Sequence, residues 1–268
     1  MSLFGYIIIL QVFYIIIRYK NFKQKYINIL AFAICIEVFI NWGYMLNIHS
    51  YEFTYSELLV FCVGLMSLYI IFKSKIELQN IFTCFFIICS IMLSCILLIL
   101  YPISTPVVPY GRGWTDFFMG NLIPVSFSAQ TIKMSLRLIL FTIIGIATIS
   151  IVNKEDIIYI NNIFIKFGVF VLIFLGFEFI LKNIFKSDIL HLALNWFFGE
   201  GISRSSKFLE REGFIAIQGF TREPAHLAAT LFYFAICTLL SNRTNRYKLR
   251  VLITISLFLF LSRSLSSV

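Results

Sequence analysis

The sequence predicts an all-α integral membrane protein, a polytopic bundle of about eight transmembrane helices. Of its 268 residues, 60% are hydrophobic and 13% are charged, whereas soluble domains carry about 45–50% apolar and about 25% charged residues. Apolar runs recur along nearly the whole chain, and most approach the ~20 residues that a helix needs to cross a bilayer core. The runs are continuous rather than alternating, which favours helices over the strands of a membrane barrel. We expect one polytopic membrane domain over residues 1–268.

Eight apolar segments account for the predicted spans. They cover residues 2–17, 27–48, 58–72, 81–101, 135–152, 163–181, 225–240 and 251–265. The first segment is apolar from its start and is followed by charge rather than by a small-residue cleavage site, so we interpret it as a span and not as a signal peptide. The first, third and last segments are short for a full crossing. Two long polar loops, residues 102–133 and 182–223, are predicted outside the membrane.

Basic residues predict the orientation of the spans. Residues 18–25, after the first segment, and residues 243–250, after the seventh, each contain four Lys or Arg side chains. Short, strongly positive connections stay in the cytoplasm. Alternation then places both long loops and the start of the seventh segment on the outer face. The net charge of +9 therefore belongs to loops between spans and does not indicate nucleic-acid binding.

The start of the seventh segment carries the most unusual chemistry. Arg222, Glu223 and His226 lie within five positions at a predicted membrane boundary, where charged groups are costly and are functional candidates by default. Pro224 is typical of a first helical position, so Glu223 has an alternative role as a helix cap. His226 lies about one turn from Arg222 and could accept a proton. Its alternative role is an interfacial histidine bonded to backbone.

Two further arginines are predicted at the same outer boundary. Arg263, between Ser262 and Ser264, ends the eighth segment, and Arg137 lies near the start of the fifth. The planar fork of arginine binds phosphate oxygens bidentately and keeps its charge. Several arginines around one cavity would suit a diphosphate, although each could instead be a boundary residue whose charge reaches the lipid headgroups.

Two carboxylates fall inside predicted spans, while several common motifs are missing. Glu37 lies mid-span in the second segment and Glu178 near the outer end of the sixth, where a functional role and a paired structural role are both open. Lys182 is expected to extend to the interface. The sequence has no Asp-x-Asp pair, nucleotide-binding glycine loop or metal-type histidine spacing, so we expect neither metal nor cofactor and disfavour a nucleotide-using transferase.

The stretch Gly219–Ala228 (GFTREPAHLA), followed by a span, a basic inner loop and a span ending Leu261–Ser264 (LSRS), resembles the bacterial O-antigen and capsular polysaccharide polymerase family. That family is related to the O-antigen ligases. Its members show a Gly-x-x-x-Glu-Pro-Ser-His-like sequence before one helix and Ser-Arg-Ser or Ser-Arg-Gly at the outer end of the next. Ala225 stands here where serine is usual. The motifs cover about residues 200–268, and the remainder is similar only in topology.

The resemblance implies a membrane glycosyltransferase of the GT-C-like kind at the outer face of the bacterial cytoplasmic membrane. It would polymerise undecaprenyl-diphosphate-linked repeat units into O-antigen, capsule or exopolysaccharide, with a flippase and a chain-length regulator as partners. Arg222 and Arg263 would bind the diphosphate, with Arg137 as a third contact. His226 would be the base for the acceptor hydroxyl, and Glu223 would orient or replace it. Independently of the resemblance, Glu178, as a carboxylate within a predicted span, and Ser262 and Ser264, beside Arg263, are candidate additional site residues.

Two other functions are weighed against the polymerase. An O-antigen ligase, which transfers glycan to a lipid core, has the same motifs and differs in its acceptor. A transporter or flippase would use Glu37 and Glu178 for ion coupling, but it predicts helices broken at mid-membrane, and none of the five prolines lies mid-span. Family members continue through further spans after the Ser-Arg-Ser helix. We therefore expect a truncated product, a fragment or an incomplete gene, and an inactive remnant with no activity of its own is a third alternative.

Overall fold

The computed structural model is helical apart from three short antiparallel strand pairs within the residues that it describes. These residues are 2–40, 44–48, 51–73, 78–100, 103–107, 123–125, 129–198, 210–211, 214–217, 219–220 and 224–262. They form two compact units. Unit 1 comprises Met1–Val63 with Val152–Val268, and unit 2 comprises Gly64–Ile151.

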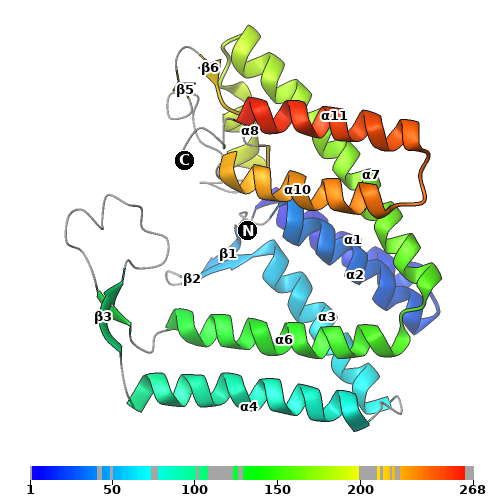
Figure 1. Cartoon of the computed structure of the whole chain (residues 1–268), viewed down its shortest axis with the longest axis vertical. Coiled ribbons are helices and arrows are strands. Elements are labelled where there is room, and N and C mark those ends of the chain that lie inside the picture. The colour runs from blue at the N-terminus through cyan, green and yellow to red at the C-terminus, as the bar shows by residue number, and fades with distance from the viewer. Residues whose placement is uncertain are drawn as a thin grey trace. The chain divides into compact units, whose positions relative to one another are not determined.

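Each predicted apolar segment coincides, for at least part of its length, with a helix (Figure 1). The helices are α1 (Leu3–Arg18), α2 (Phe22–Phe39), α3 (Tyr55–Lys73), α4 (Leu78–Leu100), α6 (Ala129–Ile151), α7 (Lys154–Phe179), α10 (Pro224–Leu240) and α11 (Asn245–Ser262). Among the described residues, three helices are long and apolar enough to cross a membrane, namely α3, residues Ile132–Ile151 and residues Lys154–Ile184. Further apolar helices, such as α1, are shorter. The chain is thus compatible with a membrane protein, and the number of spans stays a prediction.

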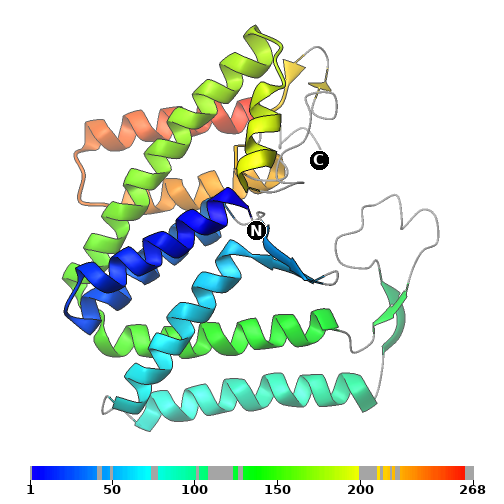
Figure 2. The ribbon, with the colours of Figure 1, turned by 180° about the vertical axis from the view of Figure 1, so that it is seen from behind.

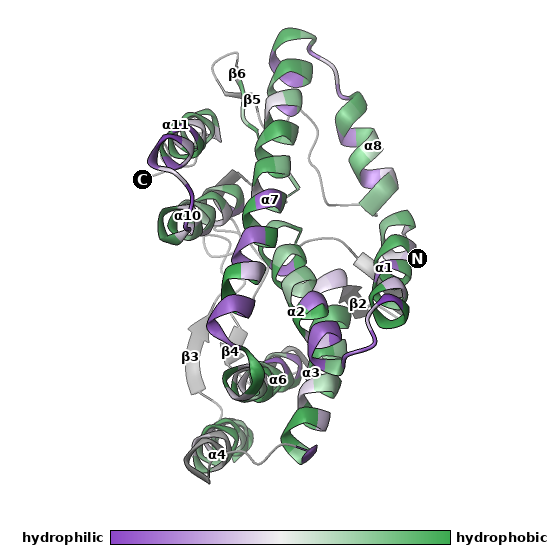
Figure 3. Cartoon of the chain, turned by 90° about the vertical axis from the view of Figure 1, so that its right-hand side faces the viewer, coloured by the Kyte–Doolittle hydropathy of each residue, from purple (hydrophilic) through white to green (hydrophobic). Residues whose placement is uncertain are grey.

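Unit 1 is organised around the long helix α7. Its start is capped by Asp156, whose Oδ2 accepts the Asn153 backbone N–H at 2.9 Å and lies 2.7 Å from Nζ of Lys23, in the first turn of α2. Along the helix, Phe164 contacts Phe39 of α2, with ring centroids 5.0 Å apart. Hydrophobic residues line the helices of this unit for most of their length (Figure 3). Buried side chains that are almost all apolar therefore hold α2 and α7 together.

The ends of the helices in unit 1 gather at two opposite sides of the unit. Helices α10 and α11 lie side by side and antiparallel (Figures 1 and 2). The Thr230 hydroxyl, in the second turn of α10, donates a hydrogen bond to the Val38 carbonyl near the end of α2 at 2.9 Å. The start of α10 therefore lies beside the ends of α2 and α11. Lys23 and Asp156 join the starts of α2 and α7 at the opposite end.

The predicted second span, residues 27–48, extends beyond the end of the helix that the structure shows. Helix α2 ends at Phe39, and Tyr44–Ile48 instead form β1, which pairs antiparallel with β2 (Tyr51–Thr54). Asn41 and Gly43, which lie between α2 and β1 in the sequence, are poor helix formers. Glu37 therefore lies two residues before the end of α2 and not near the middle of this helix.

The predicted outer loops contain regular structure that the sequence reasoning missed. Residues 182–223 include helix α8 (Ile189–Phe198) and the strand pair β5 (Glu210–Arg211) and β6 (Phe214–Ile215). Residues 102–133 include β3 (Ile103–Val107) and β4 (Ile123–Val125). With 10 residues, α8 is half the length that a span requires, so a search for spans passes over it.

Unit 2 contains α4 and α6, which run antiparallel (Figure 1), and the second half of α3. A side chain at Gly64 of α3 would bring its Cβ to 2.8 Å from Leu140 Cδ2 of α6, so glycine permits this close approach. Between α4 and α6, Cys95 Sγ lies 3.1 Å from Ser135 Oγ.

Candidate functional site

At its far end α7 widens into a π-helical turn, η1 (Ile180–Ile184). The Phe185 N–H donates to the Ile180 carbonyl at 3.1 Å, five residues back. Such turns are rare in proteins, and those that do occur are often found at functional sites. Here the turn contains a lysine, Lys182, whose side chain is fully buried.

Lys182 forms an ion pair inside the protein, and the expectation that it reaches the interface is wrong. Its Nζ lies 2.7 Å from Oε1 of Glu178, and both side chains are 0% exposed. A buried charge is costly unless an opposite charge and hydrogen bonds compensate it, and the carboxylate one turn earlier supplies both. Of the two roles open for Glu178, the paired one is the one observed.

The second oxygen of Glu178 bonds to the motif segment. Oε2 accepts the backbone N–H of Gly219 at 2.7 Å, across 41 residues of sequence. Gly219 has φ of +61°, a left-handed conformation that glycine adopts without steric cost. A Cβ at this position would also lie 2.9 Å from Leu175 Cδ2. The local structure therefore requires glycine at the residue that Glu178 binds.

Two further contacts hold the segment that precedes α10. The Asn183 side chain forms a pair of hydrogen bonds with the backbone of Ile215, donating to its carbonyl and accepting from its N–H, each at 2.9 Å. Phe220 is buried and stacks on Phe174, with centroids 4.1 Å apart. Residues 214–217 and 219–220, called the docked segment below, are thus fixed to the end of α7 and to η1.

The structure places two predicted site residues near the docked segment. His226 is the third residue of α10 and is half-buried. Leu227, the next residue, is buried, and its Cδ1 would lie 3.4 Å from a Cβ at Gly219. Ser262 is the last residue of α11 and donates its hydroxyl to the Leu259 carbonyl at 2.8 Å. His226 and Ser262 therefore share the end of unit 1 that carries the docked segment.

The remaining predicted site residues are not tested by these contacts. Arg222, Glu223, Arg263 and Ser264 lie outside the residues that the structure describes. Arg137 lies in unit 2, on α6, where its guanidinium is 5.4 Å from the centroid of the Phe141 ring. A joint site of Arg137 with the other arginines stays a prediction.

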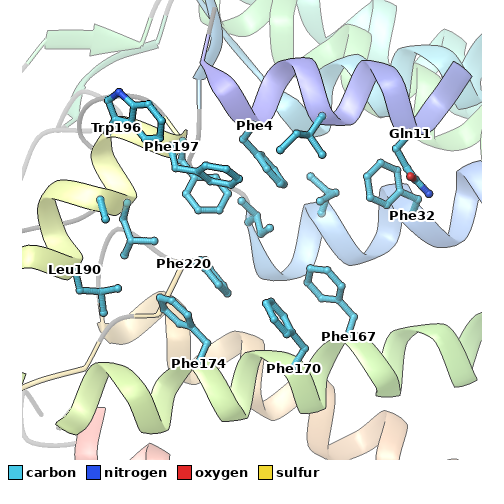
Figure 4. Close-up of a pocket in the computed structure, with 16 residues that line it drawn as sticks. Phe4, Gln11, Phe32, Phe167, Phe170, Phe174, Leu190, Trp196, Phe197 and Phe220 are labelled. Carbon is cyan, nitrogen blue, oxygen red and sulfur yellow. The ribbon is translucent and has the colours of Figure 1, made fainter. Parts of the chain in front are cut away.

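An apolar cavity of about 600 Å³ lies beside the docked segment in unit 1 (Figure 4). This volume is typical of a small-molecule site, which spans about 300–1,000 Å³. Aromatic side chains dominate the lining, and Gln11 of α1 supplies an amide. The most prominent lining residues are Phe4, Phe32, Phe170, Phe174, Phe197 and Phe220. Such a surface would favour an apolar chain, since aromatic rings offer large contact area and few polar groups.

The cavity was not found by sequence reasoning, although a signal existed. Phe167, Phe170 and Phe174 line one side of it and are spaced as neighbours on one face of a helix. Their partners come from α1, α2 and α8, which no local pattern connects to α7. Phe220 belongs both to this lining and to the docked segment, so it links the cavity to the start of α10.

Neither a metal-binding cluster among the described residues nor a similar known protein adds chemistry to these contacts. Within that part of the chain, no group of three or more His, Cys, Asp or Glu side chains is placed to hold a metal ion. No family model matches the sequence, and comparisons with curated proteins and with solved structures give no match.

Proposed function

We propose that this protein polymerises undecaprenyl-diphosphate-linked oligosaccharide repeat units at the outer face of the bacterial cytoplasmic membrane. One observation carries the proposal beyond the sequence resemblance. Phe220 lines an aromatic cavity, and Arg222 follows two residues later in the chain. A lipid diphosphate has the same order of chemistry, an apolar chain joined directly to a dianionic headgroup.

In the proposed site, the isoprenoid chain of the donor occupies the cavity and its diphosphate binds Arg222 and Arg263. The acceptor hydroxyl of a second repeat unit attacks the anomeric carbon of the donor glycan, and the bond to the diphosphate oxygen breaks. His226 takes the hydroxyl proton, while the arginines stabilise the charge that develops on the leaving diphosphate. Arg137 is a third phosphate contact, and Glu223 orients His226.

The finer architecture belongs to the same proposal. It includes eight spans, a GT-C-like arrangement and a site that faces outward. The positive-inside distribution of the short loops supports this orientation. The common end shared by His226 and Ser262 supports a single site formed by the start of α10 and the end of α11.

Complementation tests the proposal. A strain lacking this gene is supplied with the parent chain, with Arg222→Ala, Arg263→Ala or His226→Ala, and with a control, Arg246→Ala, which changes an exposed arginine at the start of α11. Glycan ladders are compared on gels at matched membrane expression. We expect long-chain glycan from the parent and control and its loss in the three site variants.

Three outcomes would count against the proposal. A normal ladder in both Arg222→Ala and Arg263→Ala would contradict the diphosphate site. A parent chain that is inserted normally and yields no ladder would contradict the polymerase function itself. Transfer of complete glycan to a lipid core without any change in chain length would identify a ligase instead.

A further inference from the structure

The buried ion pair of Glu178 and Lys182 has no role in the chemistry proposed above. Both side chains are 0% exposed, and taking two charges out of water is costly even when they pair. Well-packed apolar residues in their place are often at least as stable. A stabilising function alone is therefore a weak explanation, and the contacts of the pair suggest another.

The two carboxylate oxygens of Glu178 serve different partners. Oε1 lies 2.7 Å from Lys182 Nζ, within the end of the same helix. Oε2 accepts the Gly219 N–H at 2.7 Å, in a segment 41 residues away. A pair that only stabilised the helix end would need no bond to a distant backbone. Lys182 fixes the carboxylate, and the carboxylate fixes Gly219.

We propose that Glu178 is a positioning residue, which sets the location of Arg222 and His226 through its bond to Gly219. The inference rests on the proposed function for the reaction that these residues perform. Arg222 lies three residues after Gly219, and an extended chain spans at most about 3.6 Å per residue. On the far side of Arg222 in the sequence, Leu227 of α10 would lie 3.4 Å from a Cβ at Gly219, and His226 precedes it in the same helix.

The same bond couples the two parts of the lipid site. Phe220, which forms a wall of the cavity, follows Gly219 directly and is stacked on Phe174. On its other side, α10 begins at Pro224. Gly219 thus stands at the junction between the apolar cavity and the charged residues before α10. Releasing it would misalign the diphosphate contacts with respect to the lipid chain.

Two double variants separate positioning from packing. Glu178→Gln/Lys182→Met removes both charges and keeps an oxygen that can accept the Gly219 N–H. Glu178→Met/Lys182→Met removes the charges and the acceptor with similar side-chain volume. Both avoid the unpaired buried charge that a single substitution would leave, so both are expected to fold.

Hydrogen exchange of the Gly219 amide provides a measurement that does not depend on activity. The purified full chain in lipid nanodiscs is exchanged and fragmented to resolve residues 214–227. We expect the Gln/Met variant to retain most of the protection of the parent, because its amide oxygen can still accept the Gly219 N–H, although more weakly than a carboxylate. In the Met/Met variant exchange should rise by about tenfold or more, the factor expected from losing a hydrogen bond to a charged group. Equal protection in both variants would overturn the proposal.

Transfer kinetics then test the consequence for the site. With a lipid-linked repeat unit as substrate, the Met/Met variant should lose kcat/KM while the Gln/Met variant recovers most of it, at equal thermal stability. A Gln/Met variant as inactive as Met/Met would overturn positioning through Gly219. The predicted exchange pattern in a parent chain without any glycan transfer would overturn the proposed function and leave the Gly219 contact established.

Discussion

Replacing Gly219 by alanine should destabilise the docked segment by an amount that the structure allows us to work out. The residue has φ of +61°, and a left-handed conformation costs a residue with a Cβ roughly 1–2 kcal/mol. The added Cβ would lie 2.9 Å from Leu175 Cδ2, and Leu175 is fully buried. Overpacking of this kind costs typically about 1–3 kcal/mol. Together the two effects predict a loss of about 2–5 kcal/mol.

A second glycine supplies a matched control with the opposite sign. Gly145 lies within α6, and a Cβ there would meet nothing within 4 Å. Because alanine is the better helix former by about 0.8–1 kcal/mol, Gly145→Ala should be neutral or stabilising. The free energy of unfolding is measured by steric trapping of the purified protein in bicelles. In parallel, the rate of proteolytic cleavage at residues 214–223 is measured. A Gly219→Ala protein that unfolds and is cleaved like the parent would refute the reasoning about this turn.

Three further predictions concern neighbouring contacts. Lys182→Met alone should destabilise the protein by about 3–5 kcal/mol, because it leaves a buried carboxylate without its partner. Glu178→Met/Lys182→Met should destabilise it by much less in the same unfolding assay. Equal losses of stability in the two variants would contradict a buried ion pair. Asn183→Ala should cost about 1–3 kcal/mol by leaving backbone groups unpaired and should speed amide exchange at Ile215, and unchanged exchange would count against it. Ala193→Phe, which places a ring in the cavity, should weaken saturable binding of undecaprenyl phosphate, whereas Ala229→Phe on the exposed side of α10 should not; equal binding by both would argue against an occupied cavity.

The helices could be predicted from the sequence because their signal is local. Continuous apolar runs bounded by basic clusters identify a helix without knowledge of its neighbours. The errors arose where a run of apolar residues continues through a change of structure. Tyr44–Ile48 are as apolar as the helix before them, yet they form a strand. Helix α8 was missed for the opposite reason, because it is too short to resemble a span.

The candidate site was only partly accessible from sequence. Glu178 and Lys182 are spaced as neighbours on a helix, so their pairing could have been foreseen, and Lys182 was instead expected at the interface. The hydrogen bond from Gly219 to Glu178 could not have been foreseen, because it joins residues 41 positions apart and depends on how the docked segment folds back on α7. The aromatic cavity depends on four helices together, and no single stretch of sequence specifies it.

The central claim, that the residues after the docked segment bind a lipid diphosphate, is tested most directly by equilibrium binding. Undecaprenyl diphosphate is titrated into the purified full chain in nanodiscs of phosphatidylcholine, with Arg222→Ala and the control Arg246→Ala measured in parallel. The account predicts that Arg222→Ala weakens binding about tenfold or more, as expected for the loss of a charge-assisted hydrogen bond worth about 1.5–3 kcal/mol, and that Arg246→Ala binds like the parent. Equal affinity in all three proteins would contradict the account.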